Sequence, residues 1–130
     1  MSARIYVVED HPVMREATVT LLERQPTLSV AGAAETAEEA LAFLETNRAD
    51  LLLVDTRLPG MNGIEFVRRV TEQWPEVKCL MLSGHGGQSY IDRALEAGAR
   101  GYLTKGTAGE IPTAIEHVLD GEIYDSTADD

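Results

Sequence analysis

Acidic side chains follow two of the apolar segments in this sequence. Asp55 comes directly after the apolar run 51–54 and enters a loop rich in proline and glycine, and the pair Glu9-Asp10 comes directly after the apolar run 5–8. An ionised carboxylate is costly to bury and strands disfavour aspartate, so packing rarely explains such a position. Two apolar strands that end in acid therefore predict a cluster of carboxylates that could hold a metal ion.

Five apolar segments of strand length alternate with segments of helical periodicity. The strands are expected at 5–8, 28–33, 51–54, 78–82 and 101–104. Strict alternation of strand and helix predicts right-handed βαβ crossovers and a parallel sheet covered by helices on both faces. The expected fold class is a doubly wound α/β domain with a five-stranded parallel sheet and five helices.

The helix ends carry recognisable signals. Pro12 suits the first residue of the first helix, and Thr36 has the spacing of a capping box with Glu39. Gly98 suits the position just past the end of the fourth helix, where glycine tolerates a left-handed backbone. These signals divide the chain at the same points as the apolar segments do.

In an open parallel sheet, functional groups collect at the carboxyl ends of the strands. Besides the three acids, those ends carry Ser83 and Lys105. Carboxylate oxygens suit Mg²⁺, a serine hydroxyl can donate a hydrogen bond, and a lysine can contact a phosphate oxygen. A cation, a lysine and a hydroxyl around one carboxylate are what phosphoryl transfer to that carboxylate requires.

Composition limits the function classes. The chain has 130 residues, enough for one domain, and a net charge of −11, which argues against direct binding to nucleic acid. Its apolar segments are too short to span a membrane, and no secretory segment precedes the first strand. The single Cys79 lies in an apolar run, which predicts a buried thiol and suits the reducing cytoplasm. The acidic tail 125–130 carries no structural signal.

These motifs together resemble one family. The acidic pair, Asp55 with the loop 58–63, Ser83 and the segment 101–105 are similar to the receiver domain of two-component response regulators. The resemblance implies a receiver domain at 1–124, followed by an acidic tail or linker at 125–130, and a flavodoxin-like sheet of order 2-1-3-4-5. The stretch 10–12 and the segment 97–103 resemble the NarL, FixJ and LuxR branch, in which a helix-turn-helix DNA-binding domain follows the receiver.

The resemblance also implies residue roles. Asp55 would accept a phosphoryl group from a phosphohistidine of a sensor histidine kinase, and Lys105 would bind the phosphate. Ser83 and Tyr102 would form a switch pair, in which Ser83 moves toward the phosphate and Tyr102 then turns inward. The implied cofactor is Mg²⁺, with four protein ligands: Glu9, Asp10, Asp55 and the backbone carbonyl of Arg57.

The function implied is a cytoplasmic phosphorylation switch that regulates transcription through an output domain absent from this chain, with a homodimer forming on phosphorylation. Such a domain catalyses only its own phosphorylation and dephosphorylation. The alternatives are an interaction module that works without phosphorylation, and a stand-alone receiver. A phosphatase of the haloacid dehalogenase type would need Asp-x-Asp after the first strand, and Glu9-Asp10 would repel the phosphate of a flavin carrier.

The sequence departs from the family at two loops. Gly106 follows Lys105 where many receivers have proline, so a cis peptide bond is not assumed there. Gly84, Gly86 and Gly87 follow Ser83, and their wide backbone choice predicts a mobile loop between the fourth strand and the fourth helix.

Overall fold

The computed structural model describes residues 2–83, 88–104 and 109–125. Within these ranges strands and helices alternate along the chain. The strands are β1 (Ala3–Val8), β2 (Leu28–Ala34), β3 (Leu51–Asp55), β4 (Lys78–Ser83), β5 (Gly101–Thr104) and β6 (Tyr124–Asp125). The helices are α1 (Pro12–Glu23), α2 (Ala37–Thr46), α3 (Gly63–Gln73), α4 (Gln88–Ala97) and α5 (Ile111–Leu119).

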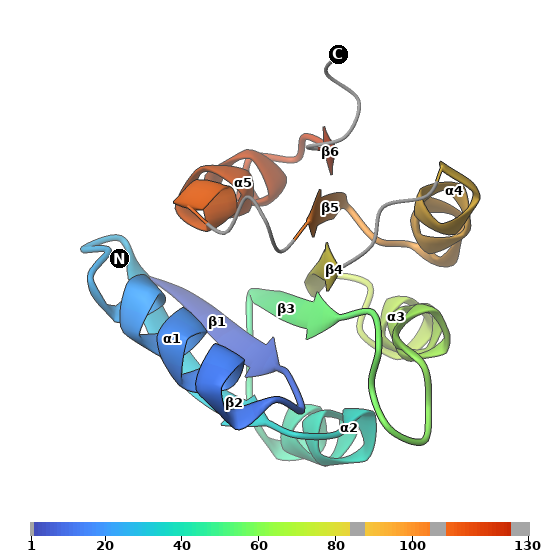
Figure 1. Ribbon diagram of the computed structural model, residues 1–130, viewed down its shortest axis with the longest axis horizontal. Helices are drawn as coiled ribbons and strands as arrows, with labels where there is room; N and C mark the ends of the chain where they lie inside the picture. The colour runs from blue at the N-terminus through green and yellow to red at the C-terminus, as the bar shows by residue number, and fades with distance from the viewer. Residues whose placement is uncertain (1, 84–87, 105–108, 126–130) are drawn as a thin grey trace.

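All described strands belong to one parallel sheet of order β2-β1-β3-β4-β5-β6. Helices α1 and α5 cover one face, and α2, α3 and α4 cover the other (Figure 1). The predicted doubly wound sheet and its order 2-1-3-4-5 are confirmed. Within the described residues, no helix is both long enough and apolar enough to cross a membrane.

The sheet has one strand more than the five predicted. The short β6 pairs with β5, Tyr124 opposite Gly101 and Asp125 opposite Tyr102. The Tyr124 amide donates to the Arg100 carbonyl at 3.0 Å. A strand of two residues has no apolar run long enough to be read from the sequence, and only its second residue, Asp125, falls in the predicted tail 125–130.

Burial is continuous in the central strands β3 and β4, whereas most residues of the edge strand β2 are partly exposed. Every residue of β3 is buried, including Asp55, and the β4 residues after Lys78 are buried as well. The helices pack against both faces of these strands, and the two hydrophobic cores lie on opposite sides of the sheet. Cys79 is a buried free thiol, as predicted.

Side-chain hydrogen bonds cap the starts of α1, α2 and α3, which follow the loops after β1, β2 and β3. Pro12 begins α1, as predicted, and the His11 side chain caps the helix by accepting from the Met14 amide. Thr36 caps α2 by accepting from the Glu39 amide at 3.1 Å. Asn62 caps α3 by accepting from the Glu65 amide at 2.9 Å. Two of these caps, His11 and Asn62, lie in the loops that follow β1 and β3.

Candidate functional site

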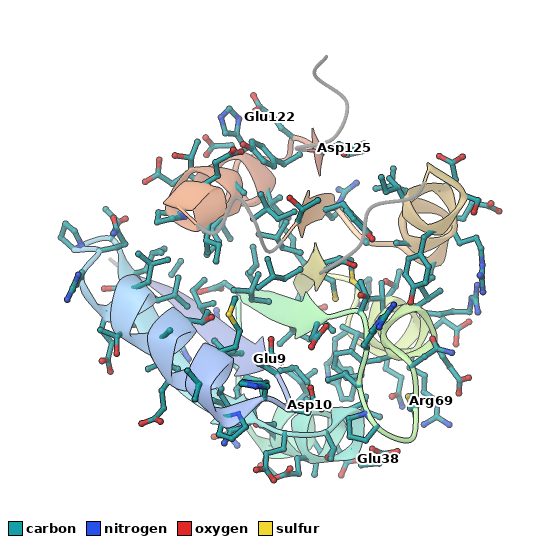
Figure 2. All side chains as sticks on the ribbon, viewed as in Figure 1. Glu9, Asp10, Glu38, Arg69, Glu122 and Asp125 are labelled. Carbon is teal, nitrogen blue, oxygen red and sulfur yellow. The ribbon has the colours of Figure 1, made fainter. Side chains whose placement is uncertain are left out.

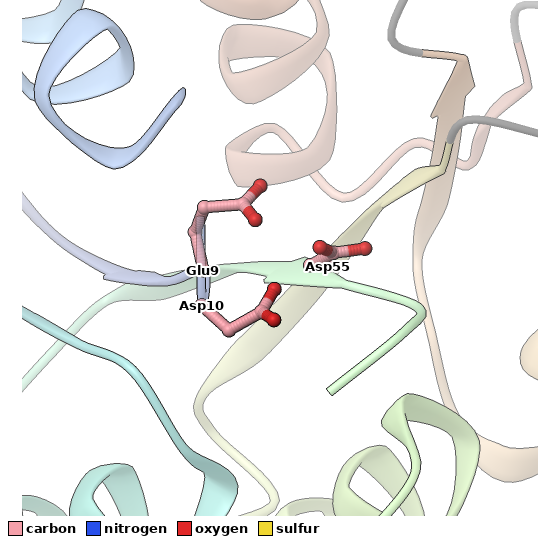
Figure 3. A group of neighbouring side chains, drawn as sticks. All are labelled: Glu9, Asp10 and Asp55. Carbon is pink, nitrogen blue, oxygen red and sulfur yellow. The ribbon is translucent and has the colours of Figure 1, made fainter. Parts of the chain in front are cut away.

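Three carboxylates meet at the carboxyl ends of β1 and β3. Glu9 and Asp10 directly follow β1, and Asp55 is the last residue of β3. One carboxylate oxygen from each side chain lies within 4.8 Å of those of the other two. The three carboxylates extend from the strand ends into the same region (Figure 3). The predicted cluster is therefore formed, and its all-oxygen donor set could hold a hard divalent cation.

Burial differs among the three acids. Glu9 and Asp55 are only 2% and 5% exposed, whereas Asp10 is exposed to solvent. Two buried carboxylates beside a third repel one another more strongly than they would in water, because little solvent screens them. A divalent cation between them would offset this repulsion, and the exposed Asp10 leaves the group open to solvent.

Hydrogen bonds hold Glu9 in place. Its amide donates to the Ala34 carbonyl at 2.9 Å, which ties the end of β1 to β2. Its Oε2 accepts from the His11 amide at 3.1 Å, and its carbonyl accepts from Arg15 Nη1 at 2.9 Å. Arg15 also pairs with Glu35 at 3.5 Å. His11 thus has a structural role at the site through its amide and its helix cap.

The loop after β3 fixes Asp55. The Arg57 amide donates to Asp55 Oδ1 at 3.0 Å, which orients the carboxylate from the backbone. The loop returns to the strand where the Gly63 amide donates to the Thr56 carbonyl at 3.3 Å. Gly60 has a φ of 77°, in the left-handed region where glycine is favoured. The coordination role of the Arg57 carbonyl stays a prediction.

A second group of polar side chains lies beside the acids. Thr56 Oγ1 donates to Ser83 Oγ at 3.0 Å, and both residues are buried. Tyr102 is fully buried and its hydroxyl is hydrogen-bonded to the Ser83 side chain. Burial raises the pKa of Tyr102, the Ser83 hydrogen bond partly offsets that rise, and Tyr90 and Asp125 raise the pKa further. Ser83 and Tyr102 are therefore in contact and both are buried, and their role as a switch pair stays a prediction.

Sequence reasoning missed two residues of this group. They are Thr56, at the start of the loop after β3, and Tyr90, whose hydroxyl donates to the Thr56 carbonyl at 3.3 Å. The contact of Thr56 with Ser83 follows from the register of the strands, which the sequence does not give. Asp55 pairs with Leu82 across β3 and β4, so the residues that come next, Thr56 and Ser83, meet on one side of the sheet.

Other predicted features lie outside the described residues. Lys105 and Gly106 are among them, and so are the glycines 84, 86 and 87 of the loop predicted to be mobile. The described part of β5 ends at Thr104, whose Cα pairs with Ser83. The end of β5 therefore lies at the same edge of the sheet as the acids, and the role of Lys105 stays a prediction.

The fold and the carboxylate cluster define a class of protein. It is a flavodoxin-like α/β domain with an acidic site at the carboxyl ends of its first and third strands. A family model described as the response regulator receiver domain matches residues 5–116. The chain belongs to this family.

Named relatives agree with that assignment. The chain is 34% identical over 122 residues to the transcriptional regulatory protein DegU of Brevibacillus brevis, covering 93% of this chain and 52% of DegU. It is 36% identical over 116 residues to the DNA-binding transcriptional activator DevR/DosR of Mycobacterium tuberculosis, covering 88% of this chain and 54% of the relative. The chain thus spans about half the length of the curated relatives it matches.

A solved structure resembles the whole chain. It is a two-component response regulator of the LuxR family from Aurantimonas sp. SI85-9A1, with a TM-score of 0.91 and 37% identity. The match covers 98% of this chain and 91% of that one. The predicted branch is therefore confirmed at the level of homologues, which are transcriptional regulators of the LuxR type.

Proposed function

We propose that this domain is a phosphorylation switch in which Asp55 accepts a phosphoryl group from a phosphohistidine of a sensor histidine kinase. The observation that carries the proposal is the place of Asp55: it ends a central strand, it is buried, and its carboxylate lies within 4.8 Å of those of Glu9 and Asp10. A carboxylate that served only packing would not be placed among two others.

The chain's own residues position the reaction. An Asp55 oxygen would attack phosphorus, the bond from phosphorus to the histidine nitrogen would break, and the imidazole would leave. The Arg57 amide holds Oδ1 at 3.0 Å, so the carboxylate has one defined orientation for in-line attack. The Ser83 hydroxyl would donate a hydrogen bond to a phosphoryl oxygen, and Lys105 would contact another.

The proposed cofactor is Mg²⁺. Glu9, Asp10, Asp55 and the backbone carbonyl of Arg57 would hold it, since all four groups offer hard oxygen ligands. When bound, the ion would neutralise charge that develops on the equatorial phosphoryl oxygens. The electrostatic repulsion among the three carboxylates supports a cation at this place.

Phosphorylation would shift the balance between two arrangements of Ser83 and Tyr102. Tyr102 is buried and its hydroxyl is hydrogen-bonded to the Ser83 side chain. We infer that a phosphoryl group on Asp55 would draw Ser83 toward its oxygens and so change this contact. The alternative function is a module whose partner binding does not need phosphorylation.

The wider role follows from the relatives. DegU is named a transcriptional regulatory protein and DevR/DosR a DNA-binding transcriptional activator, so the proposed output is transcription through a DNA-binding region outside residues 1–130. The domain itself, with a net charge of −11, is not the part proposed to bind DNA. Proposed properties are a cytoplasmic location, a homodimer on phosphorylation, and no turnover other than the phosphorylation and dephosphorylation of Asp55.

Acetyl phosphate tests the proposal without the kinase. With Mg²⁺ present, intact-mass spectrometry is expected to detect one phosphoryl adduct on the wild-type chain and none on Asp55→Asn. Beryllofluoride, which mimics the phosphoryl group, is expected to bind the wild type and not the variant. Absence of both adducts in the wild type would leave the phosphorylation-independent module as the better account.

A further inference from the structure

A buried hydroxyl beside the phosphorylation site has no part in the function proposed above. Thr56 follows Asp55 directly and is only 3% exposed. Its Oγ1 donates to Ser83 Oγ at 3.0 Å, an ordinary length for a bond between two hydroxyls. The side chain that is expected to move toward the phosphoryl group is therefore held by Thr56, in addition to its hydrogen bond with Tyr102.

Thr56 is itself fixed on several sides. Its amide donates to the Leu82 carbonyl at 3.2 Å, and its carbonyl accepts from the Gly63 amide and from the Tyr90 hydroxyl, each at 3.3 Å. A β-branched side chain also has few χ1 rotamers. A methyl group on Gly63 would lie 2.9 Å from the Thr56 Cα, so the backbone there has little room to shift. Thr56 cannot readily follow Ser83 when that residue turns away.

The consequence is a competition for one hydroxyl. If Ser83 turns toward a phosphoryl oxygen on Asp55, Thr56 Oγ1 loses its partner in a buried place. A buried donor left without an acceptor is destabilising, whereas a valine in that place has no donor to leave unsatisfied. The Thr56 bond therefore opposes the phosphorylated arrangement and leaves the Ser83 hydroxyl in the resting one.

We propose that Thr56 is a positioning residue that holds the Ser83 hydroxyl in its resting place and thereby competes with the phosphoryl group on Asp55. Thr56 does not touch the reacting atoms; it acts through Ser83, and so it sets how readily the switch responds. This inference rests on the proposed function, because it presumes that Ser83 moves toward a phosphoryl group on Asp55.

The test compares beryllofluoride affinity among variants at saturating Mg²⁺, by calorimetry or by ¹⁹F NMR of the bound mimic. Thr56→Val keeps the shape and removes the hydroxyl, and it is expected to bind about threefold to tenfold more tightly than the wild type. Thr56→Ser keeps the hydroxyl and is expected to bind as the wild type does. A matching slower loss of the acetyl phosphate adduct is expected for Thr56→Val.

A double-mutant cycle separates positioning from packing. In a Ser83→Ala background there is no hydroxyl to compete for, so Thr56→Val is expected to leave the affinity unchanged. Thr56→Ala removes the same hydroxyl with less apolar volume, and it serves if the valine variant folds poorly by urea unfolding. The same gain for both variants, absent without the Ser83 hydroxyl, is the result that supports the inference.

Three results would overturn it: an unchanged affinity in the variants without the hydroxyl, a weaker affinity, or the same gain in the Ser83→Ala background. A weaker affinity would mean that Thr56 orients Ser83 for the phosphoryl group instead of competing with it. Failure of the proposed function is distinguished by the wild type and Asp55→Asn alone, since a wild type that binds no beryllofluoride at Asp55 refutes the function whatever Thr56 does.

Discussion

Gly63 illustrates how a single residue can shape the loop that holds Asp55. A Cβ at this position would lie 2.9 Å from both the Asp55 carbonyl oxygen and the Thr56 Cα, and 3.1 Å from Met81 Cε. Two of these contacts are with backbone, which cannot move aside as a flexible side chain can. The first turn of α3 can approach the end of β3 only because residue 63 has no side chain.

Gly63→Ala is therefore expected to destabilise the domain by about 1–3 kcal/mol, the usual range for overpacking, and to reduce phosphorylation by acetyl phosphate. Urea unfolding gives the free energy of unfolding. Gly109→Ala is the matched control, because nothing lies within 4 Å of a Cβ built there. Equal stability of the two variants would contradict the expectation.

Cys79 gives a prediction for the pH dependence of stability. Burial raises the pKa of its thiol from 9.0 to about 12. Between these values the folded chain keeps the proton that the unfolded chain has released, so the folded state binds more protons and the free energy of unfolding falls as pH rises. The contribution of the protonated thiol to the free energy of unfolding is complete below about pH 9 and is lost toward pH 12. The slope of this loss is at most about 1.4 kcal/mol per pH unit.

The measurement is urea unfolding of the wild type and Cys79→Ala at a series of alkaline pH values. The alanine variant is expected to be less stable below about pH 9 because of the cavity, but to lose less stability as pH rises above about 9. All other ionisable groups are the same in both proteins, so the difference in slope isolates the thiol. Parallel curves for the two proteins would show that the thiol does not contribute.

At the scale of the elements, β6 is held by contacts that lie outside its own two residues. The Tyr124 hydroxyl donates to Glu110 Oε1 at 2.6 Å, and its ring lies 5.5 Å from that of His117, which also pairs with Glu122. Glu122 and Asp125 mark this edge of the molecule, away from Glu9 and Asp10 (Figure 2). These contacts join the start and the end of α5 to the strand that follows it.

Tyr124→Phe removes the hydroxyl and keeps the ring, so it is expected to lower the free energy of unfolding by about 1 kcal/mol. Hydrogen exchange is expected to quicken at the Tyr124 amide, which bonds to the Arg100 carbonyl, and to stay unchanged in β1 and β3. Ile123→Ala is the control, since Ile123 is 59% exposed and its truncation removes little packing. Unchanged exchange at Tyr124 would mean that the hydroxyl does not hold the strand.

The limits of sequence reasoning are also clearest at this scale. Asp55 and Ser83 were predictable because the apolar strands before them are continuous, so the residues at their ends are obvious. Thr56 was not, because its partner depends on the register between β3 and β4. Tyr90 depends on how α4 is rotated about its axis, which packing against α3 and the sheet decides. β6 has only two residues, too few to show the alternation of apolar and polar side chains that would predict a strand.

At the scale of the whole molecule, the position of Trp74 affects how the switch can be followed. Trp74 caps the end of α3, and with Ala49 and Val77 it lines a cavity of about 510 Å³ beside the residues that precede β3 and β4. The acids lie at the opposite ends of these strands. Fluorescence of this tryptophan is therefore a remote probe of Asp55, and direct measurements of the adduct are the sharper test.

The net negative charge of the whole chain predicts that bound Mg²⁺ stabilises the folded state. With a net charge of −11, the folded chain repels itself, and the group of Glu9, Asp10 and Asp55 concentrates that repulsion. A cation bound only by the folded state adds RT ln(1 + [Mg²⁺]/Kd), about 2.7 kcal/mol at a hundredfold excess over Kd. Thermal unfolding is expected to shift upward with Mg²⁺ at constant ionic strength.

The Asp10→Asn variant separates Mg²⁺ binding at the site from general charge screening. Its effect on the unfolding temperature is expected to be favourable without Mg²⁺ and unfavourable with Mg²⁺. Without Mg²⁺ it removes one repelling charge, so the variant is expected to unfold at a higher temperature than the wild type. With Mg²⁺ it lacks one ligand, so it is expected to gain less and to lose that advantage. Glu72→Gln, an exposed acid on α3, removes the same charge away from the site and is expected to gain as much from Mg²⁺ as the wild type. If all three proteins gained equally, the stabilisation would come from screening, and the carboxylate cluster would not be a binding site.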